Sequence, residues 1–305
     1  MHVGLAVLLA VLLAAAPLAG CGAAESALAR GDRLWADSNY TAALAEYRLS
    51  HDRRESDDAV LSRVAHAYAV TGQFERAREN YDELLRRAPE YTDQAIFDYL
   101  TLAERSQSRS DRYGMAGAVE SALALRPGLA VGGMAAPLAR YYARAGDGER
   151  AQVFYERALA YAPPDSVPGL LFDFAEFQEG QANCAEAIDL YNAFRTREPR
   201  GERADQARWN IGNCAFTLAR AARQAGEQEN ALGYLDTMLG LGVPQNLIDQ
   251  AWFERGEALL ELGLREEALS AYIRVLETMR PGSNQLAARA RQRIDQLRFG
   301  RDLVP

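Results

Sequence analysis

Small and aromatic residues recur along the chain with a helical spacing. At five places an alanine precedes a tyrosine by four residues, and a small residue precedes each of these alanines by twelve. The pairs are Ala43–Tyr47, Ala77–Tyr81, Ala151–Tyr155, Ala187–Tyr191 and Ala268–Tyr272. A separation of four places two side chains on one face of a helix, and small residues let two helices approach closely. The pattern therefore predicts an all-α chain built from repeated helix pairs.

Prolines mark where the second helix of a pair ends. Pro89, Pro163 and Pro199 each follow their alanine by twelve residues, and Pro281 follows its alanine by thirteen. Proline removes a backbone donor and disfavours the continuation of a helix. Successive units are accordingly about 34 to 36 residues long where the pattern is regular.

Two units depart from this spacing. The third runs through Tyr99 to Pro127, with a polar stretch at 105–112 where a turn is expected. The sixth carries Trp209 and Gly212 in its first helix and has about seven extra residues. Because these amount to about two helical turns, we expect an unusually long first helix there. A polar, arginine-rich segment at 285–297 is expected to be a helix that caps the array.

The second unit resembles the tetratricopeptide repeat, a helix–turn–helix unit of 34 residues. The matching residues are Leu61, Val64, Ala65, Tyr68, Gly72, Phe74, Ala77, Tyr81 and Pro89. The resemblance extends over residues 26–297 and implies a right-handed solenoid of about seven repeats with a C-terminal capping helix. Another repeat with two helices per unit remains the structural alternative.

The N-terminus has the features of an export signal. Residues 3–18 are apolar, and Leu18-Ala19-Gly20-Cys21 follows them. This motif resembles the lipobox of bacterial lipoproteins, which implies cleavage before Cys21 and acylation of its thiol, with a palmitate-type chain. Gly22, in place of Asp, implies the outer membrane and its periplasmic face. Met1-His2-Val3 lacks the usual basic residue, and an uncleaved membrane anchor is the alternative.

These features give the expected organisation of the chain. We expect a signal peptide at 1–20, a lipidated tether at 21–25, the helical array at 26–297 and a tail at 298–305.

Charge and composition exclude several kinds of function. The net charge is −8 and the isoelectric point is about 5.1, so binding to nucleic acid is not expected. All 34 basic residues are arginine, which excludes a lysine Schiff base and a P-loop lysine. The three histidines and three cysteines show no metal-ligand spacing, and Ser50-His51-Asp52 is an adjacency rather than a triad. We expect no catalytic site, no metal and no cofactor.

Two cysteines remain once Cys21 is acylated. Cys184 and Cys214 belong to neighbouring repeats, at the turn of the fifth and in the first helix of the sixth. An even cysteine count in an oxidising compartment favours a disulfide that closes a loop of about 30 residues. The alternative is a pair of small buried residues that stay reduced.

The resemblance also implies a concave groove lined by the first helices. Its lining positions lie three residues before, one after and four after the small residue. In repeats five to seven they are Phe172, Glu176, Glu179, Trp209, Asn213, Phe216, Phe253 and Glu257. We expect this groove to bind an apolar or basic segment of a protein partner, with Trp209 at its centre. In the alternative, the aromatic residues pack the first helices together.

The expected function is a non-enzymatic adaptor, held by lipid at the outer membrane, that binds protein partners in the periplasm. The run from Ala187 to Gly212 resembles repeats of the lipoprotein component of the outer-membrane β-barrel assembly machine. Lipoproteins associated with peptidoglycan hydrolases or with pilus secretins are alternatives within this class. A helical-repeat envelope enzyme or a small-molecule-binding lipoprotein is the alternative outside it.

Overall fold

The computed structural model describes residues 25–53, 57–278 and 284–300. The chain divides into two compact units, with the boundary in the sequence between Leu129 and Ala130. The described residues form α-helices joined by turns and three short 3₁₀ segments, without a β-strand. Cys21, the signal peptide at 1–20 and most of the tether lie outside the described residues.

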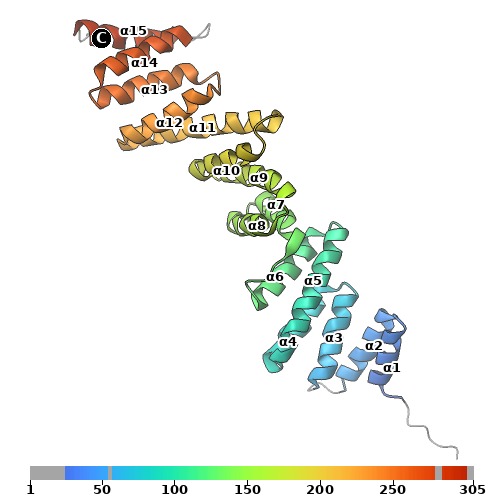
Figure 1. Ribbon diagram of the computed structural model, residues 1–305. Helices are drawn as coiled ribbons and strands as arrows, with labels where there is room; N and C mark the ends of the chain where they lie inside the picture. Colours follow the sequence, from blue (N-terminus) through green and yellow to red (C-terminus); the bar gives the residue numbers. More distant parts are fainter. Residues whose placement is uncertain (1–24, 54–56, 279–283, 301–305) are drawn as a thin grey trace, which may run out of the picture. The chain divides into compact units, whose positions relative to one another are not determined.

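The first unit contains three helix pairs (Figure 1). Its helices are α1 (Ala27–Ala36), α2 (Tyr40–His51), α3 (Asp58–Val70), α4 (Phe74–Arg87), α5 (Thr92–Ser108) and α6 (Arg112–Leu125).

The second unit contains four pairs and a final single helix. Its helices are α7 (Ala135–Ala145), α8 (Gly148–Tyr161), α9 (Val167–Gly180), α10 (Cys184–Arg197), α11 (Glu202–Ala225), α12 (Gln228–Leu241), α13 (Ile248–Glu261), α14 (Arg265–Thr278) and α15 (Asn284–Phe299). The final helix confirms the predicted cap and runs two residues into the predicted tail.

Each pair turns through one residue in the left-handed conformation. These seven residues are Ser38, Gly72, Ser110, Gly146, Ala182, Gly226 and Gly263. Each lies seven positions after a small residue of the first helix, namely Gly31, Ala65, Ala103, Ala139, Ala175, Ala219 and Gly256. Glycine adopts this conformation without steric cost, which is why it occupies four of the seven turns. The turns therefore fix one common register for all seven pairs.

A buried residue of the second helix faces the small residue of the first. It lies sixteen positions later and is Tyr47, Tyr81, Val119, Tyr155, Tyr191, Leu235 or Tyr272. A Cβ atom added at Gly31 would lie 2.6 Å from the ring of Tyr47, and one added at Gly256 would lie 2.6 Å from that of Tyr272. The contact leaves no room for a larger side chain, so the small residue sets how closely the two helices pack.

Helix α11 is 24 residues long, which confirms the predicted long first helix. Its C-terminal half packs on α12 and α13 through Phe216 and Ala219. Its N-terminal half instead packs on the preceding repeat, where Ala207 and Ile211 join the cluster around Tyr191. The extra turns therefore lie at the start of the helix, and Ala219, not Gly212, is the small residue of repeat six.

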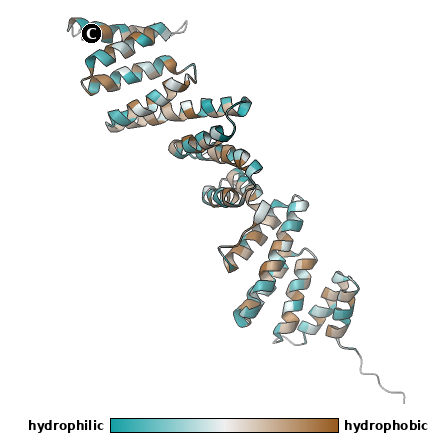
Figure 2. Ribbon diagram, in the orientation of Figure 1, coloured by the Kyte–Doolittle hydropathy of each residue, from teal (hydrophilic) through white to brown (hydrophobic). Residues whose placement is uncertain are grey.

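The C-terminal helix α15 closes the second unit. Ala290 and Ile294 pack on the cluster of Phe253 and Tyr272, which the last helix pair would otherwise leave open. Figure 2 shows hydrophobic and hydrophilic residues interspersed along all the helices, α15 included. The fold is all-α, an array of tetratricopeptide-type helix pairs with a C-terminal capping helix. None of the helices described here is both long and apolar enough to cross a membrane.

Gly212 gives a direct test of how closely the chain packs on α11. A Cβ atom there would lie 2.0 Å from the backbone oxygen of Val243, which a substitution cannot move cheaply. We expect Gly212→Ala to lower the free energy of unfolding by about 1–3 kcal/mol, the cost of overpacking. Gly233→Ala is the matched control, since this mid-helix glycine of α12 has open space around it. It should raise stability by up to about 1 kcal/mol. Denaturant unfolding that ranks the two variants equally would contradict the close approach.

Candidate partner-binding surface

The first helices carry the polar groups of the predicted groove, and in three repeats one of their acids accepts a hydrogen bond from a tyrosine of the second helix. The Tyr47 hydroxyl donates to Asp32 at 2.9 Å, and Tyr191 donates to Glu179 at 2.9 Å. Tyr272 donates to Glu257 at 2.6 Å. In each case the acid lies one or four residues after the small residue. The spacing that packs the pair thus also places a hydrogen bond at the first-helix face.

Two aromatic residues expected to line the groove are buried, which corrects the prediction. Phe172 and Phe253 lie three residues before their small residue, and both are almost fully covered. The Arg203 guanidinium lies 4.6 Å above the ring of Phe172, and that of Arg289 lies 4.3 Å above the ring of Phe253. Each ring also contacts the tyrosine of its second helix. Each ring therefore packs within its own helix pair and lies under an arginine of the helix after that pair, so neither ring is free to line a groove.

Phe216 is buried as well, for a reason that the sixth repeat explains. In the register set by Ala219, Phe216 occupies the same position as Phe172 and Phe253. It packs against Leu235 and Met238 of α12. The prediction counted this repeat from Gly212, seven residues too early, and so placed Phe216 in the groove.

Trp209 lies on the extra turns of α11 and remains 43% exposed. Asn213 is half-buried one turn later on the same side of the helix. Trp209 belongs to none of the apolar clusters that pack unit two. An indole with this exposure is a candidate for contact with a partner, because tryptophan is enriched at interfaces.

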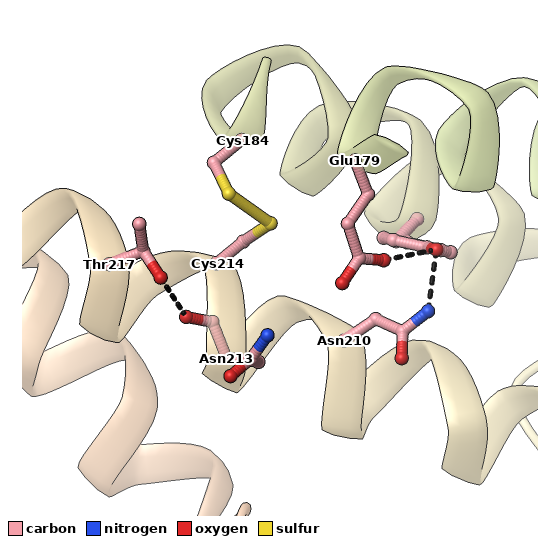
Figure 3. The surroundings of a disulfide bond; sticks show 7 residues. Glu179, Cys184, Asn210, Asn213, Cys214 and Thr217 are labelled. Atoms are coloured by element: carbon pink, nitrogen blue, oxygen red, sulfur yellow. Dashed lines mark hydrogen bonds between the residues drawn. A yellow bond between two sulfur atoms is a disulfide. The ribbon is translucent and has the colours of Figure 1, made fainter. Parts of the chain in front are cut away.

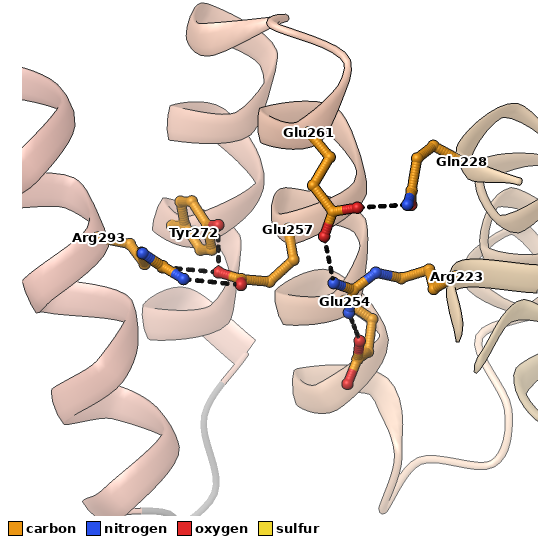
Figure 4. A network of polar contacts seen from close by, with 7 residues as sticks. All are labelled: Arg223, Gln228, Glu254, Glu257, Glu261, Tyr272 and Arg293. Carbon is orange, nitrogen blue, oxygen red and sulfur yellow. Dashed lines mark hydrogen bonds and ion pairs between the residues drawn. The ribbon is translucent and has the colours of Figure 1, made fainter. Parts of the chain in front are cut away.

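Glu257 does not present a free charge to a partner. Arg293 of the capping helix donates two hydrogen bonds to its carboxylate, with N–O distances of 2.8 and 2.9 Å. The Tyr272 hydroxyl donates a third (Figure 4). Burial raises the pKa of Glu257, but the hydrogen bonds and charge of Arg293 and Tyr272 outweigh it and hold that pKa below its usual range.

A second cation on the same face neutralises two further acids. Arg223 of α11 pairs with Glu254 and with Glu261 of α13, the latter at 3.0 Å, and Gln228 donates to Glu261 (Figure 4). Sequence reasoning missed these arginines. Arg223 lies four residues after Ala219, so the same offset rule, counted in the correct register, would have found it.

The disulfide region joins the fifth and sixth repeats. Cys184, the first residue of α10, is bonded to Cys214 in the middle of α11, with the Cα atoms 5.0 Å apart. Beside it Asn210 donates to the Tyr191 hydroxyl at 2.5 Å, and that hydroxyl donates to Glu179 (Figure 3). A covalent bond and a hydrogen-bond chain thus hold α11 against α9 and α10.

Glu176 differs from the other predicted acids. It is exposed, and no hydrogen bond or ion pair to another described residue holds its carboxylate. Although the residue is exposed, partial burial of its carboxyl group and the nearby negative charge of Asp173 raise its pKa. Across the described ranges, no group of three or more His, Cys, Asp and Glu residues is placed to hold a metal ion.

The comparisons with known proteins support the fold. The family model described as the tetratricopeptide repeat matches residues 216–284, which span the end of α11 and helices α12 to α14. No curated protein matches the sequence.

Solved structures with similar arrangements share little sequence with this chain. A tetratricopeptide repeat protein from Parabacteroides merdae is 11% identical over 89% of this chain and 97% of its own, with a TM-score of 0.32. The TPR2AB domain of yeast Sti1, in a complex with pHSP90, is 14% identical over 89% and 95%, with a TM-score of 0.34. Pseudomonas aeruginosa pilF is 18% identical over 68% and 90%, with a TM-score of 0.29. Scores at this level are too low to support an inference about ligands.

The disulfide predicts a covalent contribution to the stability of the second unit. It joins residues 30 positions apart, and a loop of this length is worth about 3–4 kcal/mol when the unfolded chain is cross-linked. We expect Cys184→Ser to lower the free energy of unfolding by about that amount in oxidised protein and by little in reduced protein. Denaturant curves with and without reductant measure both. Thiol labelling of the unreduced wild-type protein that finds Cys184 or Cys214 free would contradict the bond.

The pairing of Glu257 predicts a pH-dependent contribution to stability. Because its pKa is lower in the folded protein than in the unfolded chain, its stabilisation is present above the unfolded pKa and is lost as the pH falls through the folded pKa. We expect Glu257→Gln to cost about 1–2 kcal/mol at neutral pH. The difference from wild type should shrink below a pH of about 4. A Glu257→Gln deficit that is constant with pH would contradict the assignment.

Proposed function

We propose that the protein is a non-enzymatic scaffold that holds protein partners at the periplasmic face of the outer membrane. Cys21 is its lipidated N-terminus, and the first-helix face of unit two is its binding surface. The anchor rests on the lipobox, Leu18 to Cys21, after an apolar run. A doubly or triply acylated N-terminus holds a protein stably at a bilayer, whereas a single chain does not.

The exposed indole of Trp209 carries the binding proposal. The helices of unit two bury their apolar residues against each other, and the arginines of the face neutralise most of its acids. On the extra turns of α11, Trp209 stays 43% exposed, so this part of its area is available to a partner. Tryptophan dominates many interfaces because it buries a large area at a low entropic cost. The partner is accordingly a protein segment that covers the indole.

Photocrosslinking in the native envelope tests the proposal. A photoreactive benzoylphenylalanine replaces Trp209 in one strain and Glu186, an exposed residue of α10, in a matched control. Irradiation should give discrete adducts from position 209 alone, in the outer-membrane fraction. With Cys21→Ser added, the protein and its adducts should move to the soluble periplasm. Identical adducts from both positions contradict the binding surface, and a variant that stays in the membrane contradicts the lipid anchor.

The adduct identifies the partner for a direct affinity measurement. Trp209→Ala should then cost roughly 2 kcal/mol or more of binding free energy. It should cost little stability, since the ring is 43% exposed in the free protein. A large fall in melting temperature with unchanged affinity would assign Trp209 to the fold instead.

A further inference from the structure

A pocket of about 500 Å³ opens between the fourth and fifth repeats of the second unit. It is an open pocket lined by residues of α7, α8 and α9. Its lining includes Arg140, Arg144, Tyr155, Asp173, Glu176 and Phe177. A volume of this size accommodates a large side chain together with part of its backbone.

In five repeats a tyrosine lies sixteen positions after the small residue. Tyr155 is the one of these five whose hydroxyl has no partner among the described residues. Tyr155 is only 3% exposed. Its ring centroid lies 5.0 Å from that of Phe174 and 5.5 Å from that of Phe177. In the other four repeats with a tyrosine at this position, the hydroxyl donates to a carboxylate. Repeat four has Arg140 and Ala143 where repeats one, five and seven supply that acid. The hydroxyl of a buried tyrosine is thus left to hydrogen-bond a ligand.

Two arginines at the pocket are paired with the Asp173 carboxylate. Arg140 donates two hydrogens to Asp173, at 2.7 and 2.6 Å, and Arg203 reaches the same carboxylate at 3.3 Å. Arg144 is exposed, and its Nε donates to the backbone oxygen of Arg140. Glu176 is therefore the unpaired acid of the pocket, in surroundings that disfavour its charge.

We propose that this pocket is a subsite for a basic side chain, arginine or lysine, of a bound protein segment. The cation pairs with the Glu176 carboxylate and donates to the Tyr155 hydroxyl oxygen, and its aliphatic stem lies against Phe177. The inference rests on the proposed scaffold function and names the chemistry that its surface recognises. The net charge of −8 of the chain favours the approach of such a segment.

The raised pKa of Glu176 agrees with this role. A carboxyl group whose pKa is raised by folding destabilises the protein at neutral pH, and protonation or an arriving cation relieves that cost. Glu176→Gln should therefore leave the melting temperature unchanged or raise it. A residue that only supports the fold would lower it.

Two isosteric probes test the subsite without knowledge of the partner. N-acetyl-arginine methylamide carries the cation, and N-acetyl-citrulline methylamide has the same shape without charge. Ligand-observed NMR titrations of the full mature chain should show the arginine probe binding about fivefold or more tightly than the citrulline probe, since a hydrogen bond to a charged group is strong. Glu176→Gln should remove the preference, and Tyr155→Phe should weaken the arginine probe by about threefold. Glu186→Gln, at an exposed acid of α10, should change neither.

Three outcomes would overturn the inference. They are equal binding of the two probes to the wild type, a preference that survives Glu176→Gln, and tighter binding of N-acetyl-glutamate methylamide, which would assign the pocket to Arg144. Each of these leaves the crosslinks at Trp209 untouched, so the subsite can fail while the scaffold stands. Absence of crosslinks with an intact arginine preference would instead contradict the scaffold.

Discussion

The contact between a small residue of one helix and a large buried residue sixteen positions later holds each helix pair together. Five of the seven large residues are tyrosines, and a Cβ at Gly31 or Gly256 would touch the tyrosine ring. The ring packs the pair, while the hydroxyl emerges at the first-helix face and binds an acid there. The same side chain thereby specifies the fold and arranges the polar surface. Repeat four keeps the packing but supplies no acid, and its tyrosine faces a pocket.

Helix α11 both ties repeat six to repeat five and carries the proposed binding residue Trp209. Its extra N-terminal turns pack on repeat five, where Ile211 is buried and Cys214 is bonded to Cys184. The same turns carry the exposed Trp209. An indole on a helix that is covalently tied to its neighbour is presented in a fixed orientation, which reduces the entropy lost when a partner covers it.

The sequence was sufficient to predict the class of fold, the long sixth first helix and the capping helix. All three follow from spacings within one chain segment. The residues exposed on the first-helix face were harder to predict, because burial there depends on residues from the next repeat. Arg203 covers Phe172 from 31 residues later in the chain, and Arg289 covers Phe253 from 36 residues later. The repeat pattern does not predict either arginine.

The wrong register for repeat six accounts for the remaining differences between the predicted and the observed groove residues. Counted from Gly212, repeat six placed Phe216 in the groove and concealed Arg223. The turn residue Gly226 fixes Ala219 as the small residue, whereas the sequence analysis took Gly212 for it. The unpartnered hydroxyl of Tyr155 was within reach of sequence reasoning, since Arg140 visibly occupies the position where other repeats have an acid.

We expect the hydroxyl of the tyrosine that packs each helix pair to contribute to stability only where a first helix supplies an acid. Removing the hydroxyl alone tests this most directly, by denaturant unfolding of three variants of the same unit. Tyr191→Phe and Tyr272→Phe should each lower the free energy of unfolding by about 1–2 kcal/mol, since each removes a hydrogen bond to a carboxylate. Tyr155→Phe should leave that free energy unchanged. Equal losses in all three, or the largest loss at Tyr155, would contradict the account.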